Sequence, residues 1–152
     1  MPIVLSVEVV ADAASVFRSI AEIELWPALI PDYRSARVVR RSGQHRVVEA
    51  TTATPLWPLS WTAIQHVDRD NWTVTLRHVR GLTRGMIVAW RVDPRAPGRV
   101  KVTAELRRAE RMSSGARSGR LTLAYRILRP LTERTLRRLK RVAEGGTLAG
   151  RA

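Results

Sequence analysis

Three histidines are the side chains of this sequence best suited to proton chemistry. His45, His66 and His78 are the only histidines among 152 residues, and there is no cysteine. A histidine titrates near pH 6.5 and can serve as acid or base near neutral pH. The sequence has no glycine-rich phosphate loop, no HExxH or GxSxG motif and no metal-ligand cluster. These residue types predict cofactor-free proton transfer if the chain is an enzyme, and His45, at a turn, is expected to face solvent.

The composition is that of a globular protein. Apolar residues make up 45% of the chain and charged residues 26%, as in ordinary soluble domains. We predict one domain over residues 1–146, followed by a short flexible tail over residues 147–152. No apolar run reaches the length of a transmembrane helix, and Met1-Pro2-Ile3 lacks the pattern of a signal peptide. A cytoplasmic location is therefore expected.

The chain is strongly basic, with a formal net charge of +14. Such a charge can indicate a polyanionic partner, and it can equally reflect an arginine-rich composition, since only Lys101 and Lys140 are lysines. The arginines are spread along the whole chain. They do not alternate with exposed aromatic residues as in single-strand nucleic-acid binders, so we expect no specific nucleic-acid partner.

The elements that must position any site begin with a long helix near the C-terminus. Over residues 121–143, apolar or small side chains recur every three or four positions, which is the spacing of one helix face. They are Leu121, Ala124, Leu128, Leu131, Thr135, Leu139 and Val142. Pro130 lies within this pattern and removes a backbone donor, which predicts a kink or two helices in series.

The rest of the chain is rich in strands. A strand is predicted over residues 3–10, then helices over 13–21, with Asp12 as the N-cap, and 23–29. Six strands follow, over residues 34–41, 46–54, 59–67, 72–79, 86–92 and 99–109, and a turn is predicted at 93–98. Consecutive strands with short turns form an antiparallel meander. The fold class is therefore α+β, in the order β-α-α-β6-α, with one long helix across a seven-stranded sheet.

This order, together with particular residues, resembles the helix-grip superfamily that contains START domains, Bet v 1 and polyketide cyclases. The chain is most similar to the single-domain aromatase/cyclases of bacterial aromatic polyketide pathways. The matching residues near the N-terminus are Val16-Phe17, Ile23-Glu24-Leu25-Trp26-Pro27, Ile30-Pro31 and Tyr33. Further matches are Thr73-Val74, His78-Val79, Gly81, Met86, Val88 and Trp90, and the segment 134–140 resembles the family's final helix. The resemblance implies a curved antiparallel sheet wrapped around the long helix, with an elongated cavity between them.

Strand alternation then predicts which residues line that cavity. The inward residues of the strand at 59–67 are expected to be Ser60, Thr62, Ile64 and His66, with Leu59, Trp61, Ala63 and Gln65 facing outward. On the next three strands the inward residues are expected to be Val74, Leu76 and His78, then Met86, Val88 and Trp90, then Val100, Val102, Ala104 and Leu106. The predicted substrate contacts are Trp26, Ile30, Thr62, Ile64, Met86, Val88, Trp90, Ala104 and Leu128.

The resemblance also implies catalytic residues. Tyr33 matches a cavity tyrosine of the family, and two family arginines fall on His66 and His78. A histidine can move a proton but cannot act as a permanent bidentate cation. His66, Tyr33 and His78 are therefore the predicted catalytic residues if the activity is kept. Each has a structural alternative, as does Trp26, which is expected to pack at the cavity mouth.

The function that the resemblance implies is that of a polyketide aromatase/cyclase. Such a protein binds a hydrophobic poly-β-ketone and promotes aldol cyclisation and dehydration without a cofactor or a metal. An acidic acyl carrier protein is the expected partner. The alternative is a START-like carrier of a lipid, quinone or other hydrophobic metabolite. The sequence leaves monomer and homodimer open.

Overall fold

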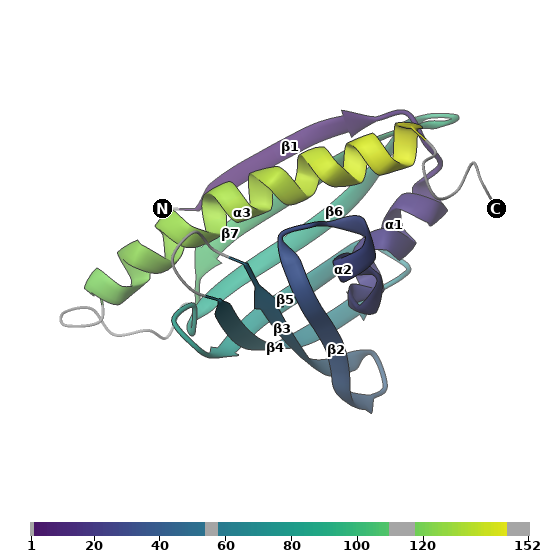
Figure 1. Cartoon of the computed structure of the whole chain (residues 1–152). Helices are drawn as coiled ribbons and strands as arrows, with labels where there is room; N and C mark the ends of the chain where they lie inside the picture. The colour runs from purple at the N-terminus through teal and green to yellow at the C-terminus, as the bar shows by residue number, and fades with distance from the viewer. Residues whose placement is uncertain (1, 54–57, 110–117, 146–152) are drawn as a thin grey trace.

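The computed structural model describes residues 2–53, 58–109 and 118–145. A curved, seven-stranded antiparallel sheet carries one long helix on its inner face, with two short helical segments at one end (Figure 1). This α+β arrangement confirms the predicted helix-grip fold. The predicted tail at 147–152 lies outside the described residues. Among the helices described, none is both long and apolar enough to cross a lipid bilayer.

The sheet is a meander closed by the N-terminal strand. Its order is β1-β7-β6-β5-β4-β3-β2. The strands are β1 (Ile3–Val9), β2 (Tyr33–Ser42), β3 (His45–Thr52), β4 (Leu59–Asp68), β5 (Thr73–Arg80), β6 (Met86–Ala96) and β7 (Arg99–Arg108). The turn predicted at 93–98 is shorter than expected, because β6 continues to Ala96 with an irregularity after Pro94. Proline at a strand irregularity loses no ladder hydrogen bond that a regular strand would need.

The short helices lie between β1 and β2. Helix α1 (Ala13–Ala21) starts at Asp12, whose carboxylate accepts from the Ser15 backbone N–H at 2.9 Å. This is the predicted N-cap, and it satisfies a backbone donor that the first helical turn leaves free. A 3-10 turn, η1 (Ile23–Leu25), leads directly into α2 (Trp26–Leu29). The two segments together place Trp26 in the interior.

The long helix α3 (Ser118–Gly145) runs without interruption through Pro130. The alternative of two helices in series is therefore wrong. Pro130 is exposed, so the carbonyl that loses its usual donor lies on the solvent side, where water can replace that donor. Continuity of α3 keeps its buried stripe in one line along the sheet.

The core lies between the inner face of the sheet and the buried stripe of α3. Leu121, Ala124, Leu128, Leu131, Thr135 and Leu139 are buried as predicted, and Val142 is half-buried. The inward residues predicted for β5, β6 and β7 are also all buried. The period-two pattern of these three strands thus identifies their core face correctly.

The C-terminal part of α3 is tied to β1 and α2. Arg138 donates to the Leu29 carbonyl of α2 at 2.8 Å. Close to its C-terminal end, Lys140 donates to the Glu8 carbonyl at 2.6 Å, and Glu144 accepts from the Val10 N–H at 2.8 Å. These contacts fix the helix against β1 and α2.

Candidate functional site

A small cavity lies between the inner face of the sheet and α3. Its volume is about 20 Å³, which is enough for about one water molecule. The lining comes from α2, from four strands and from α3: Trp26, Tyr33, Trp61, Leu76, His78, Val88, Trp90, Leu128, Leu131, Thr132 and Thr135. Side chains thus fill most of the space between sheet and helix, and any larger ligand has to displace some of them.

Aromatic rings form a continuous chain around this cavity. The His78 ring lies 4.5 Å from that of Trp61, and Trp61 lies edge-on to Tyr33 at 6.4 Å. Trp26 continues the chain, with its ring centroid 5.0 Å from Tyr33 and 6.0 Å from Trp90. Edge-to-face packing is a favoured arrangement of aromatic rings. Each ring therefore holds the next in place.

His78 is the histidine that reaches the cavity. Its side chain is 3% exposed, and its Nδ1 lies 2.6 Å from the hydroxyl of the fully buried Thr83. Burial lowers the pKa of His78 to about 3, because a charged imidazolium is poorly solvated in the interior. His78 is therefore neutral at pH 7. With Nδ1 held by Thr83, Nε2 is the ring nitrogen left for a ligand.

Thr83 belongs to a tight loop between β5 and β6. Gly81 and Gly85 bound this loop, and both have positive φ angles. A Cβ on Gly81 would lie 2.6 Å from the Ser60 carbonyl oxygen, so no larger residue fits there without a shift. Arg120 of α3 donates to the Leu82 and Arg84 carbonyls at 3.2 and 2.6 Å. The loop that holds His78 is therefore itself held by α3.

Tyr33 is buried at the start of β2 and lines the cavity beside Thr135. Burial raises the pKa of Tyr33 above its usual value of 10, and the charge of Asp32 raises it further. Arg134 pairs with Asp32 at 2.7 Å. The phenol therefore keeps its proton at neutral pH and can donate a hydrogen bond.

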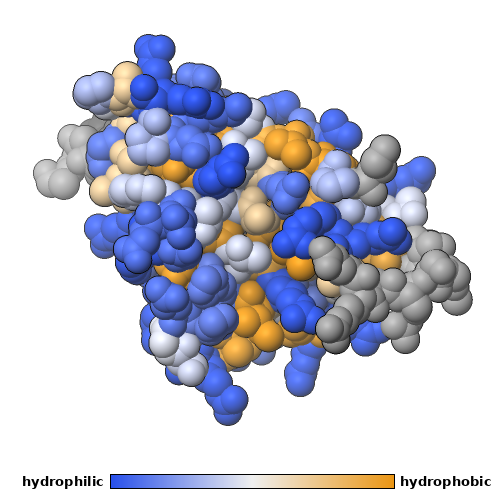
Figure 2. Space-filling view, turned by 180° about the vertical axis from the view of Figure 1, so that it is seen from behind, coloured by the Kyte–Doolittle hydropathy of each residue, from blue (hydrophilic) through white to orange (hydrophobic). Residues whose placement is uncertain are grey.

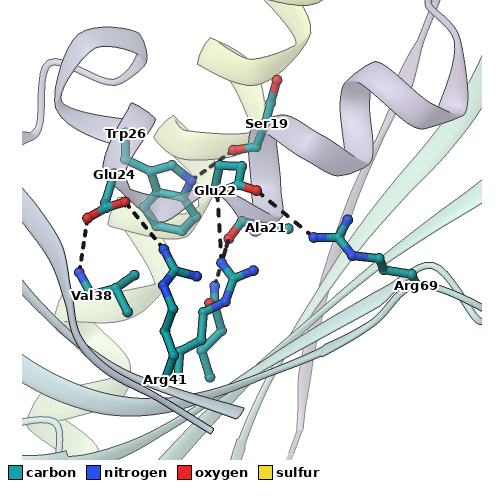
Figure 3. A network of polar contacts seen from close by, with 10 residues as sticks. Ser19, Ala21, Glu22, Glu24, Trp26, Val38, Arg41 and Arg69 are labelled. Atoms are coloured by element: carbon teal, nitrogen blue, oxygen red, sulfur yellow. Dashed lines mark hydrogen bonds and ion pairs between the residues drawn. The ribbon is translucent and has the colours of Figure 1, made fainter. Parts of the chain in front are cut away.

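The end of α1 is fixed by a polar network shown in Figure 3. The Ala21 carbonyl accepts from Gln65 at 3.2 Å and from Arg46 at 3.4 Å. Glu22 lies 3.8 Å from Arg46 and 4.0 Å from Arg69. Carbonyls at a helix C-terminus lack intrahelical donors, so the sheet supplies them here. The network holds α1 and the adjoining η1 against β3 and β4.

The three cavity tryptophans differ in their polar contacts. Trp26 Nε1 donates to the Ser19 carbonyl at 3.0 Å, as Figure 3 shows. In the part of the chain that the structure describes, Trp61 Nε1 and Trp90 Nε1 are buried without a hydrogen-bond partner. Most buried polar groups in proteins have a partner, so these two donors are exceptions on the wall of one cavity.

The predicted facing of β4 is wrong. Leu59, Trp61, Ala63 and Gln65 are buried, whereas Ser60 and Ile64 are exposed and Thr62 and His66 are half-buried on the outer face. His66 stacks there on the exposed His45, with ring centroids 4.6 Å apart. Both faces of β4 carry apolar residues, so alternation did not identify the core side. His66, Thr62 and Ile64 therefore do not line the cavity.

The other predicted residues fall in or beside the site. Tyr33, His78, Trp26, Val88, Trp90 and Leu128 line the cavity, while Ile30, Met86 and Ala104 are buried in the surrounding core. Sequence reasoning missed Trp61, Thr83, Thr132 and Thr135 as parts of the site. The size of Trp61 was a usable signal, since a large aromatic in a mixed strand favours the core side. The contact between Thr83 and His78 has no such signal.

Solved structures of similar fold cover almost the whole chain. An aromatase/cyclase from Streptomyces sp. R1128 superimposes with a TM-score of 0.83 at 14% identity, over 99% of this chain and 97% of that one. A START superfamily protein from Mycobacterium smegmatis gives 0.68 at 13% identity, over 93% and 98%. The di-domain aromatase/cyclase BexL, of the BE-7585A biosynthetic pathway, gives 0.75 at 21% identity, over 92% of this chain and 45% of that one. At these identities the similarity shows the fold alone.

The sequence itself identifies the family. Comparison with curated protein sequences gives no match. Residues 3–144 match the family described as polyketide cyclase / dehydrase and lipid transport. This range contains every strand and nearly all of α3. The chain therefore belongs to the polyketide cyclase/dehydrase and lipid transport family.

Proposed function

We propose that the protein binds a polyketide-type ligand between the sheet and α3 and promotes its aldol cyclisation and dehydration. The observation that carries this proposal is that His78 and Tyr33 line the same cavity, among aromatic side chains. Both groups are neutral at pH 7, since burial lowers the pKa of His78 to about 3 and raises that of Tyr33. They therefore act on a ketone by hydrogen bonding and proton transfer, not by fixed charge.

The chemistry assigns one task to each group. A methylene between two ketones is acidic, and His78 Nε2 accepts its proton as the enolate forms beside it, so that the negative charge of the enolate stabilises an imidazolium that burial alone disfavours. The enolate carbon forms a bond to a second ketone carbon, whose oxygen takes a hydrogen bond from the Tyr33 phenol and then a proton from the imidazolium. Loss of this hydroxyl with a neighbouring hydrogen releases water. The walls of the cavity select which two carbons meet.

The test compares variants inside and outside the cavity. We expect Tyr33→Phe and His78→Phe to lower the rate of cyclisation of a linear poly-β-ketone mimic at least tenfold. Both changes keep an aromatic ring. His66→Ala is the matched control, because His66 lies on the outer face, and its rate should equal that of the parent. Equal rates for all four proteins would contradict the catalytic roles.

The second candidate is a carrier of the same fold without chemistry. None of the described residues that line the cavity is an arginine, so none of them is a permanent cation that could polarise a ketone, and this favours the carrier. A carrier would bind a quinone or related metabolite and return it unchanged. Recovery of unreacted ligand from a complex that stays bound for hours, with no effect of Tyr33→Phe, would select the carrier.

We further propose an acidic acyl carrier protein as the partner that delivers the ligand. The outer side of α3 supports this, because it presents a row of exposed arginines: Arg126, Arg129, Arg134, Arg137 and Arg141. Arg129, Arg134 and Arg137 already contact acidic residues of this chain. Arg126 and Arg141 have no acidic partner among the described residues. A complementary acidic surface would be attracted to this row.

A further inference from the structure

Trp61 and Trp90 hold two donors in the interior that nothing in the described protein uses. Each side chain is 3% exposed, and each lines the cavity. Their indole N–H groups have no acceptor among the described residues. An indole nitrogen can only donate, so a partner for either group has to bring an acceptor atom.

A buried donor without an acceptor is costly. It has lost its hydrogen bonds to water and gained none from the protein. A single such group is tolerated in many proteins, but here two lie on the wall of one small cavity. The third cavity tryptophan, Trp26, is satisfied by the Ser19 carbonyl. The cost of the two unpaired donors is removed when a ligand oxygen enters between the sheet and α3.

The charge of the cavity narrows the choice of ligand. The described residues that line it are apolar, aromatic or hydroxyl-bearing apart from His78, and burial keeps His78 neutral by lowering its pKa to about 3. A carboxylate or phosphate would be buried there with no cation from these residues, which is strongly unfavourable. A ketone oxygen accepts hydrogen bonds without a charge. The cavity therefore suits a neutral ligand.

We propose that Trp61 and Trp90 form a two-donor site for the ketone oxygens of an uncharged ligand. This inference deepens the proposed function and rests on it for the position of the ligand. The oxygens can belong to a polyketone or to a quinone, since both offer the same acceptor. The ligand is larger than this cavity of about 20 Å³, so some of the side chains that line it have to move on entry.

Three naphthalene probes of similar shape test the acceptor and the charge separately. Acetylnaphthalene carries a ketone, isopropylnaphthalene replaces it with a hydrocarbon group, and naphthoate carries a negative charge. We expect the parent protein to bind the ketone about three- to tenfold more tightly than the hydrocarbon. Naphthoate should bind most weakly of the three. Isothermal titration calorimetry or tryptophan fluorescence measures the dissociation constants.

Phenylalanine variants of the three tryptophans identify the donors. Trp61→Phe and Trp90→Phe should each remove part of the preference for the ketone and leave hydrocarbon affinity within about twofold. Trp26→Phe is the matched control, because its N–H is already bonded to Ser19. It should change the affinity for ketone and hydrocarbon by the same factor. Dissociation constants of a quinone and of a linear polyketone, measured with the same variants, show which of these two ligand classes the site prefers.

Melting temperatures of the ligand-free proteins give an independent measure. All three changes lose packing because the phenylalanine ring is smaller, but Trp61→Phe and Trp90→Phe also remove a buried, unpaired N–H, so their Tm should lie about 2–4 °C above that of Trp26→Phe. Trp26→Phe should lower the Tm, because it leaves the Ser19 carbonyl without its donor. If the parent protein shows no preference for the ketone, or if Trp26→Phe reduces that preference as much as Trp61→Phe does, the inference is wrong.

The readouts separate this inference from the proposed reaction. A ketone preference that depends on Trp61 and Trp90, found without any cyclisation, keeps the two-donor site and removes the catalytic proposal. Cyclisation that is unaffected by Trp61→Phe and Trp90→Phe, with no ketone preference, overturns the two-donor site alone. If none of the probes binds, a fall in Tm that is as large for Trp61→Phe and Trp90→Phe as for Trp26→Phe overturns it as well.

Discussion

His78 is a buried base whose environment keeps it uncharged. Its Nδ1 contacts Thr83 at 2.6 Å, and its ring packs on Trp61. Burial lowers the pKa from 6.5 to about 3. In the unfolded chain the same imidazole binds a proton at much higher pH. The difference couples folding to pH, whatever ligand the cavity accepts.

The predicted consequence is a loss of stability in mild acid. Between pH 6.5 and about 3, the unfolded state holds a proton on His78 that the folded state does not, so stability falls as pH falls. The slope from this one residue is about 1.4 kcal/mol per pH unit. Urea unfolding gives the free energy of unfolding at each pH. Between pH 6 and pH 4 this free energy should fall less steeply with pH in His78→Phe than in the parent. Parallel curves for the two proteins would contradict a buried, neutral His78.

Residue by residue, the sequence predicts the site only where the two faces of a strand differ. His78 was predicted inward because β5 begins with a clear alternation of polar and apolar residues. In β4 the apolar Ile64 competes with Trp61 and Ala63, so the pattern is ambiguous. The structure resolves it through a distant contact, since Gln65 donates to Ala21, 44 residues earlier. No local pattern displays such a contact, and the assignment of His66 was wrong for that reason.

At the scale of elements, the β5–β6 loop joins the sheet to α3. Gly81 adopts φ +94°, and its α-carbon faces the Ser60 carbonyl so closely that a Cβ would lie 2.6 Å from that oxygen. Gly98, in the β6–β7 turn, has φ +73° but nothing within 4 Å of such a Cβ. Both positions require a left-handed backbone. Only Gly81 also requires the absence of a side chain.

Substitution of these two glycines by alanine should therefore reduce the stability of the protein by different amounts. Gly98→Ala should lose about 1 kcal/mol from the strained φ alone. Gly81→Ala should lose about 1–3 kcal/mol more, because β4 and the loop have to separate. Chemical denaturation gives both values, and exchange of the His78 and Met86 amides should increase only in Gly81→Ala. Equal losses of unfolding free energy in the two variants would mean that the loop accommodates the Cβ added at position 81 without any movement of β4.

For the whole molecule, charge is the property that most affects encounters with other proteins. The formal net charge is +14, and the surface seen from behind is mainly hydrophilic, with scattered hydrophobic residues (Figure 2). The exposed arginines of α3 lie on one side of the helix, opposite the buried stripe. A field of one sign speeds association with an acidic partner and weakens as salt rises.

Charge reversal tests the proposed carrier-protein surface. Replacing Arg141 by glutamate should weaken binding of an acidic acyl carrier protein about tenfold at low salt. The difference from the parent should shrink as ionic strength increases. Arg40→Glu, on the exposed end of β2, is the control for a change of charge elsewhere. A loss of the same size from Arg40→Glu would assign the effect to net charge instead of to α3.

The fold as a whole was more predictable than the site. The order of elements and the stripe of α3 follow from periodicity, because each depends on residues close in sequence. The sequence left open whether α3 is one helix or two at Pro130, since exposure of Pro130 decides it. The small volume of the cavity was not predictable either. It depends on how the rings of Trp26, Tyr33 and Trp61 pack, and these come from three separate elements.

The pairing of β1 with β7 has a consequence for how the chain reaches this structure. The strand partners Ile3 and Leu106 are about a hundred residues apart, and β1 also holds the C-terminal end of α3 through Glu8 and Val10. During synthesis β1 therefore has no strand partner until β7, near the end of the chain, has been made. Such long-range pairing slows folding. Until it forms, the unpaired edge of β1 can pair with other chains, which leads to aggregation. The yield of folded protein therefore depends on how soon β1 pairs with β7 once that strand has been made.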